Sequence, residues 1–149
     1  MQNSRYVLCI PAAFLLLLMT SSLMITGMAR ADEVVRQFDG TWDTIVTCPN
    51  SNGALGFSYH FASTIRDGVF HGERGDKGKP GWFQLDGKIL KDGSARLYAD
   101  GLVGAAPFAV GQRPAGTQYG FHVASTFTDS SGTGTRLEGR PCSVEFTKK

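Results

Sequence analysis

The chain has 149 residues, of which 15 are Lys or Arg and 13 are Asp or Glu, so its formal net charge is +2. This is the length of one ordinary domain. The near balance of charge excludes a strongly basic, nucleic-acid-binding surface and a long acidic tail as dominant features of the chain.

Residues 1–31 have the pattern of an export signal. Arg5 is the only charged side chain before the end of a mostly apolar stretch over residues 6–25, and Ala29-Arg30-Ala31 matches the A-x-A pattern at which such signals are cleaved. We therefore expect cleavage after Ala31 and an exported protein, either periplasmic or secreted. The alternative is a membrane anchor over residues 6–25, because an apolar run of about 20 residues can span a bilayer.

Cleavage would leave 118 residues, consisting of a short lead over 32–37 and a single domain over 38–149. Arg5 and Arg30 would be removed, so 13 basic and 13 acidic residues would remain and the net charge would be zero. A neutral domain has no electrostatic attraction to nucleic acid, so no nucleic-acid partner is predicted. Contact with a membrane is expected only through an uncleaved signal.

The cysteines predict one disulfide bond. Cys9 lies within the signal, so Cys48 and Cys142 are the two cysteines that the mature chain would keep. Exported proteins fold in oxidising compartments, where such a pair forms a bond. Closing a loop of about 100 residues is worth at most roughly 4.7 kcal/mol in the chain-entropy model. The alternative is a pair of free, buried thiols.

The mature chain is predicted to be all-β, because its apolar residues alternate with a period of two and no stretch after Ala31 has a sustained helical period. Asp-Gly favours the tight turns of hairpins. This dipeptide recurs at 39–40, 67–68, 86–87, 92–93 and 100–101, and each occurrence predicts a chain reversal.

The predicted strands, in chain order, are 41–48, 55–66, 69–74, 82–90, 94–100, 118–128, 135–140 and 142–147. We expect 82–90 to be two short strands with a kink, because Asp86-Gly87 interrupts it, and the alternative is one bent strand. Two strands have especially clear alternation. Their predicted inward residues are Trp42, Thr44, Val46 and Cys48 on the first, and Tyr119, Phe121, Val123, Ser125 and Phe127 on the sixth.

Seven or eight strands joined by short turns form an antiparallel meander, which protects its edges by closing into a small barrel or a two-layer sandwich. Cys48 ends the first strand and Cys142 begins the last, so a bond between them would join the two strands that meet when a barrel closes. This favours the barrel. A β-sandwich with adjacent terminal strands remains the alternative.

Several short segments between residues 38 and 146 carry a resemblance. They are Phe38-Asp39-Gly40-Thr41-Trp42, Thr47-Cys48-Pro49, Gly53-Ala54-Leu55-Gly56, Asp67-Gly68-Val69, Gly78-Lys79-Pro80-Gly81 and Pro141-Cys142. Together they resemble a small exported β domain of alphaproteobacteria, a likeness that implies a periplasmic or secreted β domain and no particular functional residue.

The start Gly40-Thr41-Trp42 and the end Phe146-Thr147-Lys148 are also similar to the first and last strands of avidin-type barrels. Biotin-binding barrels present several tryptophans to their ligand, whereas Trp42 and Trp82 are the only ones here, so biotin binding is not implied.

No catalytic, metal or cofactor site is predicted. His60, His71 and His122 lie on predicted strands without the spacing of a metal site, and we interpret them as residues of the polar face. The chain also lacks a G-x-S-x-G motif, so none of its serines is predicted to be a nucleophile.

Two segments, 75–82 and 102–117, are longer than a barrel turn requires, and long loops frequently carry binding residues. Their candidate residues combine aromatic, guanidinium and ammonium groups. The alternative for the two aromatic residues is that they cap the barrel core. The five candidates are Trp82, Phe108, Arg113, Lys77 and Lys79.

The leading functional hypothesis is therefore an exported, non-catalytic domain that binds a small molecule, an envelope component or a protein. The alternatives are a periplasmic inhibitor of a hydrolase and, less favoured, an envelope hydrolase. A small-molecule carrier predicts an apolar cavity. An inhibitor predicts a filled core with a protruding loop, and an enzyme predicts clustered acid and base groups.

Overall fold

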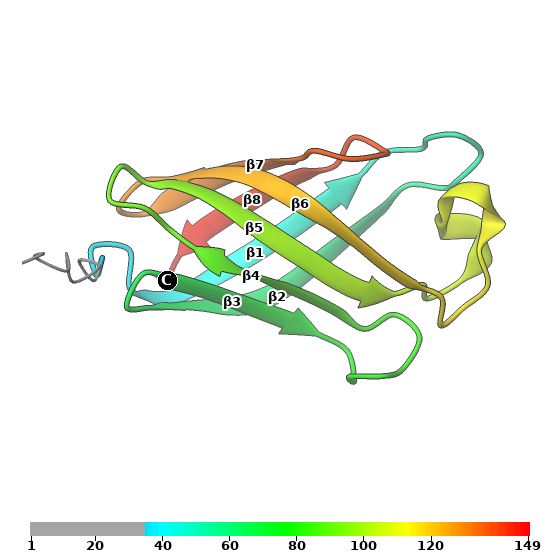
Figure 1. The fold of residues 1–149 in the computed structure, drawn as a ribbon, viewed down its shortest axis with the longest axis horizontal. Helices are drawn as coiled ribbons and strands as arrows, with labels where there is room; N and C mark the ends of the chain where they lie inside the picture. Colours follow the sequence, from blue (N-terminus) through cyan, green and yellow to red (C-terminus); the bar gives the residue numbers. More distant parts are fainter. Residues whose placement is uncertain (1–34) are drawn as a thin grey trace, which may run out of the picture. The chain divides into compact units, whose positions relative to one another are not determined.

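The computed structural model describes residues 35–149, and the predicted signal, its cleavage site and the alternative anchor lie outside this range. Eight antiparallel strands follow one another around a closed barrel (Figure 1), which confirms the predicted all-β fold. Among the described residues, no helix is long and apolar enough to cross a membrane. The strands are β1 (Gly40–Cys48), β2 (Phe57–Arg66), β3 (Val69–Arg74), β4 (Phe83–Lys88), β5 (Ser94–Leu102), β6 (Gln118–Phe127), β7 (Ser131–Arg136) and β8 (Ser143–Lys148).

The barrel closes where β1 pairs with β8, in a register that runs from Trp42 opposite Lys148 to Thr47 opposite Ser143. This pairing excludes the sandwich alternative, because it leaves the sheet without a free edge. The disulfide between Cys48 and Cys142 is present, with an S–S distance of 2.05 Å and 94 residues of sequence separation. It fastens the end of β1 to the segment that leads into β8, as predicted.

The predicted inward faces of β1 and β6 are correct. Side chains of the first strand from Trp42 to Cys48 are buried at every second position, and so are those of the sixth from Phe121 to Phe127. Thr44 is a polar member of the core, and its hydroxyl lies 2.7 Å from the hydroxyl of Ser63 on β2. The pair satisfies two polar groups that would otherwise be buried without partners.

The prediction of two strands over 82–90 is wrong, because Asp86-Gly87 lies inside the single strand β4. Asp100-Gly101 is likewise inside β5 rather than in a turn. Both glycines make room for large neighbouring side chains: an added Cβ would lie 2.7 Å from Leu97 Cδ2 at Gly87 and 2.6 Å from the Tyr119 hydroxyl at Gly101. Glycine here serves close packing of side chains and not chain reversal.

The strand predicted over 135–140 is also misplaced, since β7 spans Ser131–Arg136 and the residues that follow it form a loop. Glycine has low strand propensity, so the presence of Gly132 and Gly134 made this segment look unlike a strand in the sequence. A Cβ at Gly132 would lie 2.9 Å from the ring of Phe127, so packing of aromatic rings against a bare backbone overrides that propensity here.

One end of the barrel is filled by aromatic rings. Trp42 lies at its centre and donates a hydrogen bond of 3.0 Å from Nε1 to the carbonyl of Phe38. The ring centroids of Phe127 and Phe146 are 4.6 Å apart, and the rings of Phe70 and Phe146 meet edge to face at 5.2 Å. We call this the closed end. It carries the β2–β3, β4–β5 and β6–β7 turns (Figure 1).

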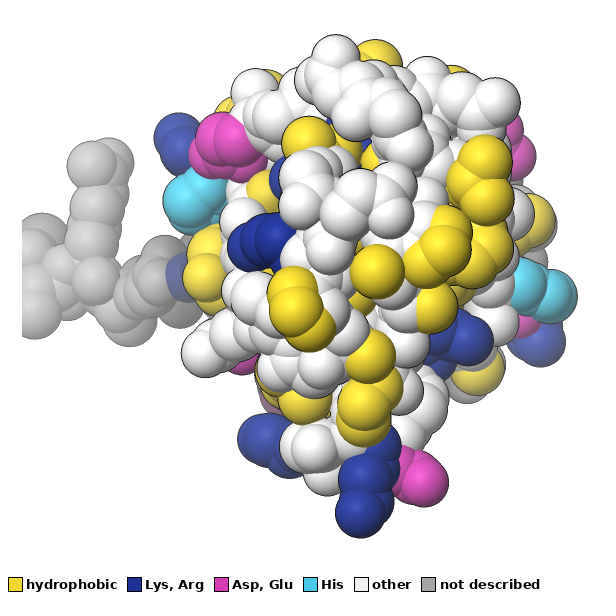
Figure 2. All heavy atoms as spheres, turned by 90° about the vertical axis from the view of Figure 1, so that its right-hand side faces the viewer, with side chains coloured by type: hydrophobic (Ala, Val, Ile, Leu, Met, Phe, Trp, Pro, Cys, Tyr) yellow, Lys and Arg dark blue, Asp and Glu magenta, His cyan; other side chains and the backbone are white. Residues whose placement is uncertain are grey.

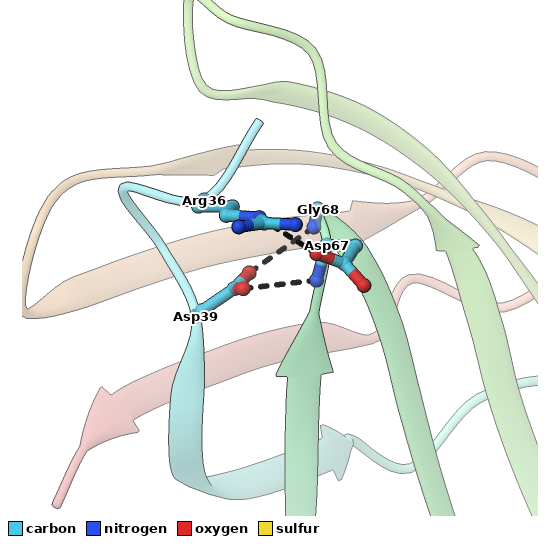
Figure 3. A network of polar contacts seen from close by, with 4 residues as sticks. All are labelled: Arg36, Asp39, Asp67 and Gly68. Carbon is cyan, nitrogen blue, oxygen red and sulfur yellow. Dashed lines mark hydrogen bonds and ion pairs between the residues drawn. The ribbon is translucent and has the colours of Figure 1, made fainter. Parts of the chain in front are cut away.

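The segment before β1 is fastened to the closed end through the β2–β3 turn (Figure 3). The carboxylate of Asp39 accepts hydrogen bonds from the backbone amides of Asp67 at 2.9 Å and Gly68 at 3.1 Å, and Arg36 Nε lies 2.8 Å from Asp67 Oδ1. Asp67 and Gly68 have positive φ angles of 52° and 73°, which explains why Asp-Gly occupies this turn.

Candidate functional site

The opposite end, which we call the open end, contains a cavity. Its volume is about 80 Å³, enough for several water molecules, and beside it lies a shallower groove of about 310 Å³. The loops at this end are 49–56, 75–82, 103–117 and 137–142 (Figure 1). The cavity and the groove share the wall residues Phe57, Tyr59, Gly104, Ala105 and Phe108, so together they form one continuous recess.

Aromatic rings from β2, β4 and β6 form the wall of this recess. Strand alternation places Tyr59, Phe83 and Phe121 at inward positions, where ring centroids are 5.8 Å apart for the first pair and 6.3 Å for the second. Tyr119 stacks on Phe121 with nearly parallel rings at 6.2 Å, and Phe57 packs against Tyr59 at 4.5 Å. The wall therefore consists of packed aromatic rings and is apolar, so it suits the burial of a ring or a short hydrocarbon group.

Two arginines extend into the open end from opposite walls of the barrel. Arg74 and Arg136 are the last residues of β3 and β7, two strands separated by three others in either direction around the closed sheet. Gly72 and Gly134, two residues before the arginines, are buried, so both arginines lie at inward-facing positions of their strands. The Arg74 Cζ lies 4.1 Å from the ring centroid of Tyr59, and the Arg136 Cζ lies 4.0 Å from that of Phe121. Both guanidinium groups thus lie against the aromatic wall.

Arg140 holds the rim of the open end together. Its side chain is buried, and its guanidinium donates hydrogen bonds of 2.9 Å to the carbonyls of both Phe108 and Leu55, with a further one to the carbonyl of Pro49. These three acceptors belong to two different loops. The Arg140 Nε has no hydrogen-bond partner among the described residues.

The arginines of the recess form no ion pair with a carboxylate of the described residues, although burial, which lowers the pKa of Arg136, is opposed in part by the charge of Glu138. Among residues 35–149, no carboxylate oxygen lies within 4.0 Å of the guanidiniums of Arg74, Arg136 or Arg140. Burial lowers the pKa of Arg136 and Arg140 from its ordinary value, but arginine stays protonated in proteins. Two nearby acids have other partners: Asp100 accepts from Gln118 at 3.2 Å, and Glu138 accepts from the ring and backbone amide of His122.

Two tyrosine hydroxyls add hydrogen-bond donors. Burial raises the pKa of Tyr59 and of Tyr119 above the ordinary value of 10.0, and nearby arginine charges oppose the rise, those of Arg136 and Arg74 for Tyr119 and those of Arg74 and Arg140 for Tyr59. Both phenols are therefore protonated at neutral pH. Neither hydroxyl has a hydrogen-bond partner within the described part of the chain.

The rim around the recess exposes several large apolar side chains among polar ones. Figure 2 faces this end of the barrel and shows hydrophobic side chains scattered among polar ones, with Lys and Arg between them and below. Four large apolar residues of the loops leave 40% to 51% of their surface exposed: Leu55, Phe108, Val110 and Leu137.

Of the five residues predicted from the sequence to contact a ligand, the structure places two at the recess. Phe108 and Arg113 line the cavity. Trp82 does not line it, because this side chain is buried under its own loop, where Nε1 donates to Glu73 Oε1 at 2.5 Å. Lys77 lies over the Trp82 ring with its Nζ 5.6 Å from the centroid, and Lys79 is exposed on the same loop away from the recess.

Sequence reasoning missed Arg74, Arg136 and Arg140. It also did not assign Tyr59 or Tyr119 to a site. The signal for Arg74 was present, because it continues the inward parity of Phe70 and Gly72. The signal for Arg136 was hidden by the misplaced strand. Arg140 gave none, since its partners lie 32 to 91 residues away along the chain and depend on how the loops fold.

The histidines lie on the outer wall, as their strand parity predicted. Each is close to a carboxylate: His60 Nε2 to Asp43 at 3.5 Å, His71 Nδ1 to Asp86 at 2.6 Å, and His122 Nδ1 to Glu138 at 2.8 Å. Within residues 35–149, no three His, Cys, Asp or Glu side chains are grouped so that they could hold a metal ion.

Comparisons of the chain with protein-family models, with curated proteins and with solved structures found no match. The function is therefore inferred from the geometry of the recess itself.

Proposed function

We propose that this protein is an exported, non-catalytic barrel that binds a small molecule in the recess at its open end. The observation that carries the proposal is the difference between the two ends: aromatic rings around Trp42 fill one, while an aromatic-lined cavity of about 80 Å³ occupies the other. Small-molecule sites are typically concave and mostly apolar, with a few convergent polar groups, and the recess has these features.

Export is supported by two independent features. The first is the signal pattern of residues 1–31, and the second is the Cys48–Cys142 disulfide, a bond that persists mainly in oxidising compartments. Both features suit a periplasmic or secreted protein.

The recess favours small-molecule binding over hydrolase inhibition. An inhibitory loop would be expected to stand away from its scaffold, whereas segment 103–117 is fastened to the rim. The carbonyl of Pro107 accepts a hydrogen bond of 2.8 Å from the amide of Leu55, and the carbonyl of Phe108 accepts one from Arg140. Catalysis is less favoured, because the histidine–carboxylate pairs of the described residues face outward from the barrel wall.

Native mass spectrometry tests the proposal on exported protein purified from its own cell envelope. We expect an extra mass of small-molecule size that disappears after denaturation. Ala105→Trp should abolish it, because Ala105 is exposed at the recess and its extended backbone accepts a large side chain that would fill the opening. Ala124→Trp, on the exposed outer face of β6, is the matched control and should keep the extra mass. A co-purifying protein in place of a small molecule would contradict the proposal and favour the inhibitor.

A further inference from the structure

We infer that the ligand of the recess is an anionic amphiphile, whose negative group is bound by Arg74 and Arg136 and whose apolar part lies against the aromatic wall. The inference rests on the proposed function and adds the chemical class of the ligand to it. Carboxylate, sulfonate and phosphate groups are all anionic hydrogen-bond acceptors, so the same arginine and tyrosine donors would bind any of them.

The first argument is the placement of the two arginines. Arginine is seldom placed in a barrel interior without a charged partner, yet both β3 and β7 end on an arginine at an inward-facing position. Both charges act on the hydroxyl of Tyr119, where they oppose the effect of its burial. Arg136 lines the cavity and Arg74 lines the groove that adjoins it, so both cationic groups border the same recess.

The second argument is the absence of an ion-pair partner for Arg74 and Arg136 among the described residues. Placing two positive charges on the border of one partly buried recess costs free energy unless an anion lies near them. The protein supplies Arg74 with the carbonyl of Gly81 at 3.1 Å and Arg136 with the carbonyl of Glu138, which satisfy hydrogen bonds but leave both positive charges in place. An anionic ligand would supply the missing negative charge.

The third argument is the set of free donors around the charges. The hydroxyls of Tyr59 and Tyr119 are without partners among the described residues, and each lies on a ring of the aromatic wall. An anion bound between the arginines could accept hydrogen bonds from them. Bonds of this type, to a charged acceptor, are about twice as strong as bonds between neutral groups.

The size of the recess limits the apolar part of the ligand. A cavity of about 80 Å³ accepts one ring or a short hydrocarbon chain, and a longer ligand would continue into the groove of about 310 Å³ beside Gly81 and Gly104. Neither glycine carries a side chain that would block this path.

Two fluorescent probes test the inference directly. 8-Anilinonaphthalene-1-sulfonate and N-phenyl-1-naphthylamine have the same ring system, but only the first carries a sulfonate. We expect the protein to bind the sulfonate probe at least about tenfold more tightly, a difference of about 1.4 kcal/mol, because its sulfonate accepts charge-assisted hydrogen bonds from the arginines. The Arg74→Gln, Arg136→Gln double variant should bind both probes with similar affinity, whereas Arg66→Gln, exposed at the closed end, should keep the preference.

The outcomes separate the inference from the proposed function. If the wild-type protein binds both probes equally and Ala105→Trp abolishes both, the recess binds small molecules but the anion preference is refuted. If neither probe binds, or if Ala105→Trp leaves both affinities unchanged, the proposed function fails and the inference with it. The wild-type comparison of the two probes decides the matter even if the double arginine variant does not fold.

Discussion

Arg140 carries a buried positive charge whose partners within the described residues are backbone carbonyls and the Phe57 ring, the latter 5.2 Å from its Cζ. Removing a charge of this kind leaves its acceptors desolvated and without donors, which is costly in a buried site. The residue therefore contributes to function indirectly, because it fixes the loops that shape the recess.

Replacement of Arg140 should destabilise the protein. We expect Arg140→Gln to lower the free energy of unfolding by about 2–4 kcal/mol, since a shorter, neutral side chain cannot reach the carbonyls of Pro49, Leu55 and Phe108 together. Urea unfolding measures this change. Arg66→Gln, the same substitution at an exposed position, should alter the value by less than about 0.5 kcal/mol. Equal effects of the two substitutions would show that Arg140 does not organise the rim.

Tyr59 and Tyr119, which are partly buried, predict how stability depends on pH. Because burial raises the pKa of Tyr59 and Tyr119 in the folded protein, the unfolded chain releases these protons first as the pH rises above 10.0. Their contribution to the free energy of unfolding is therefore fully present below that pH and is lost above it. Urea unfolding across this range should show a decline that is smaller in the Tyr59→Phe, Tyr119→Phe variant. An unchanged decline would refute the burial of these hydroxyls.

At the scale of single elements, glycines decide where sequence reasoning succeeds. The strands β1 and β6 could be predicted because their apolar residues alternate without interruption. The bounds of strands β4 and β7 could not be predicted, because glycine in a sequence resembles a turn residue. The glycines of these strands face inward and make room for side chains of neighbouring strands, and those contacts are formed only in the folded barrel. The recess was predicted in part: the long segment 102–117 was identified as a candidate binding loop, but the path that brings it to Arg140 depends on tertiary contacts.

Gly93 in the β4–β5 turn and Gly78 in the β3–β4 loop form a matched pair of glycines. Gly93 and Gly78 have φ angles of +82° and +81°, but an added Cβ would lie 2.2 Å from the Phe127 carbonyl oxygen at Gly93 and would meet nothing within 4 Å at Gly78. Gly78→Ala should cost about 1 kcal/mol for the backbone conformation alone. Gly93→Ala should cost at least about 2 kcal/mol more, because backbone must move. Thermal or urea unfolding compares them, and similar costs would contradict the described packing of this turn.

For the molecule as a whole, closure of the barrel and the disulfide act together. Cys48 follows the β1 residues that pair with β8, so the bond fastens the seam where the first and last strands meet, at the end of the barrel that holds the recess. A crosslink of this span restricts the unfolded chain strongly. It also holds the Cys48 side of the cavity wall in place against the loop that contains Arg140.

Loss of this bond should destabilise the entire domain. We expect the Cys48→Ala, Cys142→Ala variant to have a free energy of unfolding about 2–4 kcal/mol below that of the oxidised protein. Urea unfolding provides the measurement, and intact mass before and after reduction verifies that the wild-type bond had formed. If the oxidised protein and the variant were equally stable, the bond would not contribute to holding the seam.

The recess at the open end is best tested by locating a bound probe. Nuclear magnetic resonance of the ¹⁵N-labelled protein, titrated with 8-anilinonaphthalene-1-sulfonate, reports every backbone amide separately. We predict saturable shifts at the open end, at the amides of Tyr59, Gly104 and Arg136, and unchanged positions for Phe38 and Gly93 at the closed end. Shifts that cluster on the outer wall or at the closed end, or no shifts at all, would contradict ligand binding in the recess.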